Sequence, residues 1–415
     1  MSATGAGAIL EGPIGSSSSF LFSARRSYLD LLFNAAGFSF VPRYWDFQLK
    51  TSHRLSRRDG LSFLFVGALD DISFNNDDAD DIYDNSRTLA PNIQQYFAGL
   101  TWDRLFTGSR LEVSVGRTFT SFETTQTLFT DPPETILKNF SDEGENGLRV
   151  EWATDPARTL SWTIGTNLKF ASDLTYDVEV AGEVRTDQNG EPQALAVDTS
   201  FTAFRNATYA EASIRASDRL RVTAGLRADY YDFVDDGFRL SPRIGATWQV
   251  ASSTSLRGSL GRYVQPPSYI WLIGDPGNPE TLTPIVSDQV TLAVEQLLRP
   301  DLRLQLEGYY KSYDDYPARV FRPQAVLSPS GFEDATNDIP FGLEPLLSTG
   351  TGSSYGAELF LQKRLSEIPL YGLLSLSLSR SEYASIEGLD RPGTYDTRFI
   401  GSISTGWRIN PKWEV

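Results

Sequence analysis

The 415-residue sequence has no cysteine, one histidine (His53) and one methionine. Without cysteine, the chain has no disulfide framework, no thiolate metal site and no cysteine nucleophile. A single histidine rules out a metal site built from several imidazoles and leaves at most one imidazole for acid–base chemistry. These absences count against most classes of enzyme.

Long apolar runs and basic residues are scarce as well. No stretch reaches the roughly 18 apolar residues that a helical membrane span requires. The first residues, Met1 to Gly15, have neither the basic nor the apolar region of a secretory signal. Lys and Arg number 37 against 53 Asp and Glu, a net charge of −16. Such an acidic balance argues against a nucleic-acid partner, because binding nucleic acid needs a basic patch.

The dominant pattern is a strict alternation of apolar and polar residues over ten or more positions, repeated many times. In residues 301–311, Leu302, Leu304 and Leu306 share one face, and Arg303 and Glu307 lie on the other. The same alternation runs through residues 219–231 and 160–170. A period of two indicates β-strands that separate an apolar from a polar environment.

The connections between these strands are of two alternating kinds. Short turns, such as those near residues 56–60, 106–109 and 251–254, alternate with connections that are mostly long and polar. We expect long loops at residues 70–91, 121–144, 175–199, 265–287, 313–353 and 383–394. Tight turns at one end and long loops at the other are typical of a bacterial outer-membrane barrel, with the turns on the periplasmic side.

Strand counting supports this class. About 17 complete strands fit between Ala6 and Asn410, and another begins at Trp413. Unpaired backbone groups in lipid cost several kcal/mol each, so a membrane sheet must close. We therefore predict an all-β fold, a transmembrane antiparallel barrel of the outer-membrane type. The 415 residues would be a fragment of a barrel of about 22 strands.

Several segments resemble TonB-dependent outer-membrane receptors. Residues 11–15 (EGPIG) with 19–30 (SFLFSARRSYLD) are similar to the first barrel hairpin of that family. Residues 240–245 (LSPRIG) with 255–268 (SLRGSLGRYVQPPS) look like its mid-barrel strands, and 354–359 (SYGAEL), 362–365 (QKRL) and 376–383 (LSLSRSEY) like later strands. The resemblance covers nearly the whole chain. It implies a 22-stranded barrel whose lumen is plugged, and we expect residues 1–415 to be a partial barrel domain without plug, TonB box or signal peptide.

Candidate ligand-binding residues lie where strands enter the long connections. Aromatic and charged residues follow one another in residues 309–319, and an apolar group stands in the otherwise polar loop of residues 265–287. Such residues could contact a ligand by stacking and hydrogen bonding, although an aromatic girdle or packing between loops explains them as well. The substrate-binding candidates are Tyr269, Trp271, Tyr313, Asp314, Tyr316 and Arg319.

Polar residues on the inward face would line the lumen, where they would meet a plug in a receptor or water in a porin. These lumen-facing candidates are Arg221, Arg227, Asp229, Arg303 and Glu307. We predict no catalytic residue, no metal site and no cofactor. The acidic run Asp70, Asp71, Asp77, Asp78, Asp80 and Asp81 lacks the spacing and central glycine of a calcium-binding helix-loop-helix, so a solvated loop is favoured.

The resemblance implies active uptake of a scarce nutrient of the siderophore-iron, cobalamin or glycan class at the outer membrane. The implied partners are outer-membrane lipid, the TonB complex through a plug that this chain lacks and a small nutrient ligand, with a surface lipoprotein as an open further partner. A passive channel or surface-binding barrel without energy coupling is the main alternative. An outer-membrane enzyme and a soluble all-β binding protein are two others.

Overall fold

The computed structural model describes residues 5–327, 339–410 and 412–415. In these residues one antiparallel sheet contains seventeen strands of ten or more residues, which confirms the all-β class and the predicted number of complete strands. The long strands are β1 (Gly5–Ile14), β2 (Ser18–Ser27), β3 (Phe40–Arg54), β4 (Asp59–Phe74), β5 (Asn92–Phe106), β6 (Ser109–Leu128), β7 (Glu134–Thr154), β8 (Leu160–Val180), β9 (Leu195–Arg215), β10 (Leu220–Tyr231), β11 (Phe238–Ala251), β12 (Thr254–Gln265), β13 (Ile285–Arg299), β14 (Leu302–Arg319), β15 (Leu346–Lys363), β16 (Leu370–Ala384) and β18 (Phe399–Asn410).

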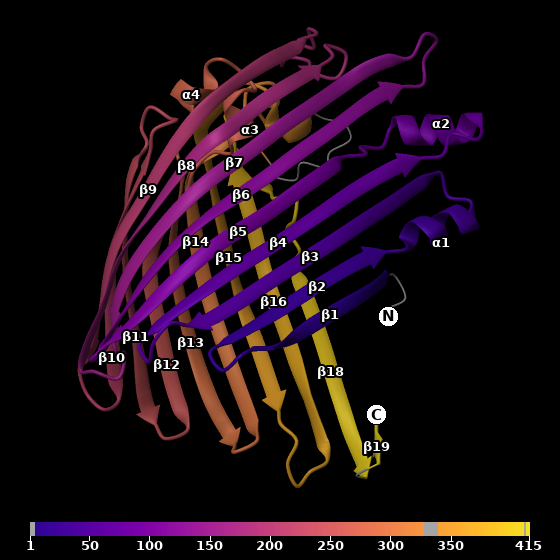
Figure 1. Cartoon of the computed structure of the whole chain (residues 1–415). Coiled ribbons are helices and arrows are strands. Elements are labelled where there is room, and N and C mark those ends of the chain that lie inside the picture. The colour runs from indigo at the N-terminus through magenta and orange to yellow at the C-terminus, as the bar shows by residue number, and fades with distance from the viewer. Residues whose placement is uncertain (1–4, 328–338, 411) are drawn as a thin grey trace.

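Long strands that follow one another in the sequence are hydrogen-bonded neighbours in the sheet. Two short strands, β17 (Arg391–Pro392) and β19 (Trp413–Glu414), pair with β16 and β18, respectively. Figure 1 shows the sheet curving round, with β1–β9 as its front wall and the later strands behind. Within the described residues β1 pairs with β2 alone, so the curved sheet is open between β1 and β18.

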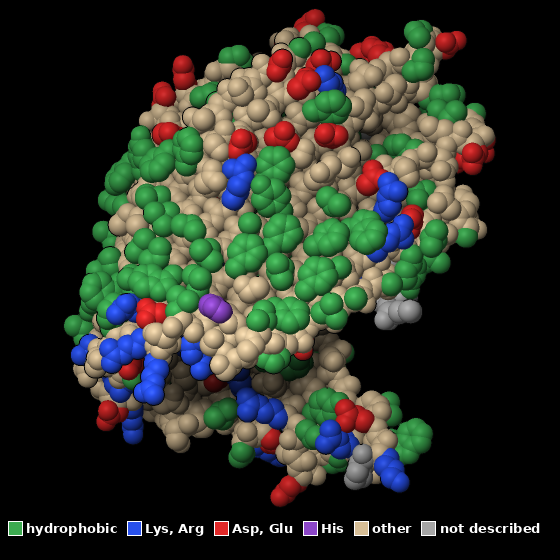
Figure 2. Space-filling view, in the orientation of Figure 1, with side chains coloured by type: hydrophobic (Ala, Val, Ile, Leu, Met, Phe, Trp, Pro, Cys, Tyr) green, Lys and Arg blue, Asp and Glu red, His purple; other side chains and the backbone are tan. Residues whose placement is uncertain are grey.

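The alternating residues form an apolar band on the outer face. Leu306 and Tyr310 of β14 are each 48% exposed, and they lie opposite Leu359 and Tyr355 of β15. Figure 2 shows hydrophobic side chains in a broad band across the front wall. A continuous exposed band of this kind is expected where a sheet faces lipid instead of water.

The two ends of the sheet differ, as predicted. The short turns have two to six residues, for example residues 107–108, where Gly108 has a φ of 80° that favours glycine. The longer connections contain all the helices in the described residues: α1 (Leu29–Ala36), α2 (Ala79–Ser86), α3 (Tyr269–Leu272), α4 (Asn278–Thr281) and the 3₁₀-helix η1 (Pro340–Gly342). No helix in the described part of the chain has the length and apolar character to cross a membrane.

The loops predicted at residues 121–144 and 175–199 are mostly strand. β6 continues to Leu128 and β7 begins at Glu134, and β8 and β9 leave only residues 181–194 between them. The reason is that the polarity pattern inverts beyond the apolar band, where the outer face meets water. Val178 and Val180 are buried there, while Glu179 between them is exposed. A bulge between Ala171 and Leu174 also interrupts the alternation.

The acidic run is not a single loop, because Asp70 and Asp71 belong to β4 and the residues after β4 lead into α2, where Asp77, Asp78 and Asp80 are exposed. The side chain of Asp78 accepts hydrogen bonds from the backbone N–H groups of Asp80 and Asp81, at 3.0 and 2.9 Å, and so caps the N-terminus of α2. Carboxylates in the first turn also interact favourably with the helix dipole. These acidic residues therefore have a local structural role.

Candidate functional site

Three connections pack together at the end of the sheet opposite the short turns, which we call the mouth. They are the connection between β8 and β9, the one between β12 and β13, and the one between β14 and β15. Their apolar side chains form two buried clusters with the outer ends of β7–β10 and β15. We call this structure the loop cap. Its buried members include Ile136, Leu137, Leu174, Tyr176, Val178, Leu272, Leu282, Leu327, Leu343 and Leu346.

Asn278 of α4 holds two of these connections together. Its side-chain amide donates to the carbonyl oxygens of Trp271 and Glu344 at 2.6 and 2.9 Å, and its Oδ1 accepts from the backbone N–H of Leu346 at 2.9 Å. Only 1% of Asn278 is exposed. A buried amide whose groups are paired in this way fixes one arrangement of the chain.

Arg185 joins the β8–β9 connection to the others. Its guanidinium donates to the carbonyl oxygen of Gly274 at 3.1 Å and lies over the ring of Phe321, 5.4 Å from its centroid. Burial lowers the pKa of Arg185. Nearby, Arg322 of the β14–β15 connection donates to the carbonyl oxygen of Thr186 in the β8–β9 connection at 3.1 Å. Arg185 and Arg322 thus each bind a backbone carbonyl of a connection other than their own.

Tyr269 links the loop cap to the sheet wall. Its ring packs edge-on against Phe201 and Phe233, with centroids 6.3 and 5.1 Å away, and its hydroxyl lies 3.5 Å from Oε2 of Glu145. Trp271, two residues later, is only 7% exposed because it is part of the apolar core of the loop cap. Of these two candidates, Tyr269 is the one in contact with polar groups of the wall.

Ion pairs line the wall below Tyr269. Glu145 accepts from Lys169 of β8 and Arg205 of β9, both at 2.6 Å. Further toward the short turns, Glu151 accepts from Arg149 at 2.6 Å and from the Tyr209 hydroxyl at 2.5 Å. Paired charges of this kind form a polar wall with little uncompensated charge. None of these residues is among the candidates from the sequence, because Glu145 meets Lys169 and Arg205 on other strands, and Glu151 meets Tyr209 two strands away.

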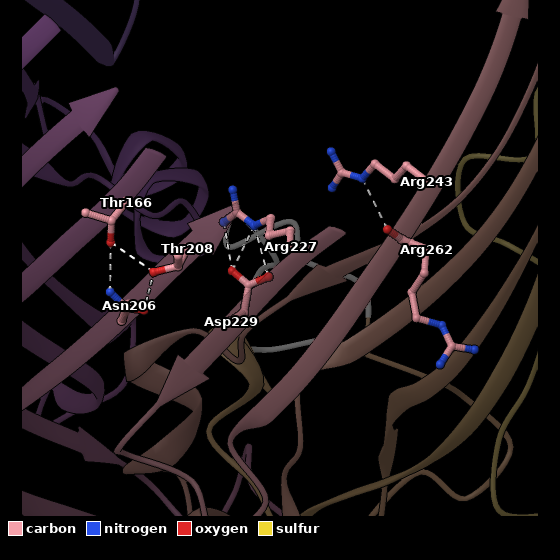
Figure 3. A network of polar contacts seen from close by, with 7 residues as sticks. All are labelled: Thr166, Asn206, Thr208, Arg227, Asp229, Arg243 and Arg262. Carbon is pink, nitrogen blue, oxygen red and sulfur yellow. Dashed lines mark hydrogen bonds and ion pairs between the residues drawn. The ribbon is translucent and has the colours of Figure 1, made fainter. Parts of the chain in front are cut away.

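The five lumen-facing candidates also have polar partners. Arg227 is paired with Asp229, with 2.8 Å between the charged atoms, and Figure 3 shows the two side chains pointing toward each other. Arg221 donates to Ser213 at 3.3 Å, and Arg303 is paired with Glu295 at 2.6 Å, while Glu307 accepts from Gln305 at 3.4 Å. Arg227 and Asp229 alternate along β10 with the exposed Leu226 and Tyr230, so they extend from the opposite face of the strand.

The remaining candidates lie on the last residues of β14 instead of in a loop. Tyr313 and Tyr316 pack with Tyr383 of β16, with ring centroids 5.8 and 5.1 Å from that of Tyr383. Asp314 is exposed. Arg319 is buried in an ion pair with Glu344 at 2.5 Å. The tyrosines and Asp314 are thus placed near the mouth, whereas Arg319 stabilises the loop cap.

His53, for which no role is expected, is the second-to-last residue of β3 and lies beside a short turn, where its Nδ1 contacts the hydroxyl of Ser18. In the described residues no three or more side chains of the metal-binding types gather in one place. The candidate site therefore consists of the loop cap, the wall beneath it and the tyrosines Tyr313, Tyr316 and Tyr383 on β14 and β16.

Comparison of the chain with known proteins identifies its family. The model of the TonB-dependent receptor-like β-barrel matches residues 30–415. No curated protein sequence matches the chain. Among solved structures, the ferric enterobactin receptor of Pseudomonas aeruginosa is similar over 99% of this chain and 71% of its own, with 13% identity and a TM-score of 0.65.

Two further structures show the same fold. A copper transporter matches over 98% of this chain and 65% of its own, with 13% identity and a TM-score of 0.68. The alcaligin receptor of Bordetella pertussis matches over 97% and 63%, with 12% identity and a TM-score of 0.61. With its sheet, its apolar outer band and the family match across residues 30–415, this chain belongs to the TonB-dependent receptor family of the bacterial outer membrane.

Proposed function

We propose that this chain is the barrel wall of a TonB-dependent importer for a scarce nutrient. Among the siderophore-iron, cobalamin and glycan classes, we place metal chelates first, since similar structures include a ferric enterobactin receptor, an alcaligin receptor and a copper transporter. Because their sequence identity to this chain is low, these structures support the fold alone. A metal chelate as the cargo is therefore our proposal.

The observation that carries the proposal is the loop cap above an ion-paired wall. Tyr269 reaches from α3 to within 3.5 Å of Glu145, which is itself paired with Lys169 and Arg205. Loops that are packed together at one mouth of a barrel provide a pre-formed surface for a ligand. In this proposal Tyr269, Tyr313, Asp314 and Tyr316 contact the cargo.

Trp271 and Arg319 have a supporting role here, because both are buried in the loop cap. The inward residues Arg221, Arg227, Asp229, Arg303 and Glu307 would face a plug domain that belongs to the same receptor but not to residues 1–415. The plug would connect the barrel to the TonB complex, and the barrel would need no catalytic residue. A surface lipoprotein that covers the loops is a further proposed partner.

Uptake measurements test the proposal. We expect cells that make the complete receptor to accumulate radiolabelled ferric chelate, and both deletion of TonB and dissipation of the proton gradient should abolish accumulation. A receptor with Tyr269→Ala should bind the chelate more weakly, with Phe129→Ala as the control, because Phe129 is exposed in another connection. Accumulation that persists without TonB would instead support the passive channel, and binding without any accumulation would support a surface-binding barrel.

A further inference from the structure

A pocket lies beside the loop cap, between the β14–β15 and β16–β18 connections. Its volume is about 280 Å³, and Tyr316, Tyr383 and Tyr395 contribute to its lining. Tyr395 is 70% exposed, whereas the rings of Tyr316 and Tyr383 pack against each other with centroids 5.1 Å apart. Three tyrosines therefore contribute to the lining of a space of the size of a small organic group.

The position of Tyr383 depends on two glycines. A β-carbon at Gly393 would come within 2.8 Å of Cε2 of Tyr383, and one at Gly352 would come closer still to Cδ1. Contacts this short are not tolerated, so only glycine at both positions leaves room for the ring. The sequence thus keeps the ring of Tyr383 at this pocket.

The charged residues that line the pocket are Asp396 and Arg391, and each has an ion-pair partner. Asp396 lines the pocket, its side chain is 6% exposed, and it accepts from the backbone N–H of Ser381 at 2.8 Å. Its other oxygen is 3.4 Å from Nε of Arg398, whose side chain is 68% exposed. Arg391 also lines the pocket, but its guanidinium is paired with Glu387 at 2.7 Å.

The surrounding connections are strongly acidic. The eight connections at the end opposite the short turns contain 22 Asp and Glu but only 5 Lys and Arg, whereas the short turns contain 4 Asp and Glu and 6 Lys and Arg. Figure 2 shows acidic side chains gathered mainly at the long-loop end and basic ones at the opposite end. A field of this sign attracts cations and repels anions before contact is made.

We propose that the pocket lined by Tyr316, Tyr383, Tyr395 and Asp396 binds an alkylammonium group of the cargo. Rings of tyrosine attract such a cation through their negative faces, and the attraction is stronger for a desolvated group. Asp396 supplies a nearby negative charge. The inference rests on the proposed receptor function and adds the charge and chemical class of one part of the cargo.

Binding to the complete receptor in detergent tests the inference with three probes of nearly the same shape. Choline is cationic, 3,3-dimethylbutan-1-ol is its neutral isostere and 3,3-dimethylbutanoate is anionic. We expect choline to bind roughly tenfold more tightly than the neutral probe in saturation-transfer NMR titrations, in keeping with cation–π attraction. The anionic probe should bind most weakly.

Variants separate the contributions. Tyr383→Phe should keep most of the preference for choline, Tyr383→Leu should remove most of it, and Asp396→Asn should weaken choline binding without changing that of the neutral probe. Tyr309→Leu is the matched control, since Tyr309 lies on the same strand as Tyr316 but does not line the pocket. The heat-dependent gel shift of a folded barrel checks that each variant folds.

Equal affinity for choline and its neutral isostere would overturn the inference, and so would tighter binding of the anion. If Tyr383→Leu fails to fold, Tyr383→Phe and Asp396→Asn still decide between a cationic and an apolar pocket. Failure of the importer proposal is distinguishable, because it is measured as TonB-dependent accumulation. A receptor can show either result without the other.

Discussion

Tyr209 on β9 donates a hydrogen bond of 2.5 Å to Oε2 of Glu151 on β7, across the intervening strand β8. Gly165 of β8 lies directly between them, as the register partner of both residues. A β-carbon there would come within 2.5 Å of the Tyr209 hydroxyl. The bond therefore exists because β8 has no side chain at this position.

Gly165→Ala should displace Tyr209 and destabilise the barrel by about 1–3 kcal/mol, as overpacked sites do. Gly147→Ala is the control, because a β-carbon at Gly147 would have no atom nearer than 3.9 Å. Unfolding by denaturant in lipid vesicles measures the free energy of unfolding of both variants. Similar losses for the two variants would contradict the role assigned to Gly165.

A positive charge on the outer band should destabilise the assembled barrel. We expect Leu304→Arg or Leu226→Arg to cost about 2–4 kcal/mol near mid-membrane depth. Gln305→Arg, on the opposite face of β14, should be tolerated better. Membrane assembly assays compare these variants, and equal tolerance of Leu304→Arg and Gln305→Arg would refute the orientation given to the strand.

Asn278→Ala should loosen the loop cap and leave the strands intact. The variant loses three hydrogen bonds, to Trp271, Glu344 and Leu346, and an unpaired buried polar group costs about 1–3 kcal/mol. Hydrogen exchange should accelerate in residues 269–282 and 343–346 but not in the middle of β7. Asn189→Ala, in an exposed turn of the β8–β9 connection, should leave the exchange of both segments unchanged.

At the end of the sheet with the short turns, the carboxylate of Asp301 makes the stability of the barrel depend on pH in the acid range. The hydrogen bond from Lys363, and then that from Ser366, lowers the pKa of Asp301 from 3.8 to about 2. Because the pKa in the folded state is the lower one, the stabilisation is complete above about pH 4 and is lost as pH falls toward 2. Unfolding measured across this range should show the loss, and Asp301→Asn should remove that part of the pH dependence.

The alternation was sufficient to predict the class of fold, since a residue such as Leu226 faces lipid and its neighbour Arg227 does not. The candidate site was less predictable. Trp271 is buried with Leu272 in the loop cap, which is the alternative of packing between loops, and local periodicity does not distinguish such packing from a ligand contact. Tyr383 was missed, since its role depends on Tyr316, 67 residues earlier.

The class of fold and the difference between the two ends follow from the sequence by itself, because both depend on local periodicity and on the lengths of connections, and the resemblance of several segments to known receptors indicates the family. The tertiary structure alone decided which side chains meet. Glu151 reaches Tyr209 only through the register that places Gly165 between them, and Asn278 joins residues 271 and 344 only after two connections fold together. Such contacts arise from strand register and loop packing over long sequence distances, where no pattern of neighbouring residues specifies the partner.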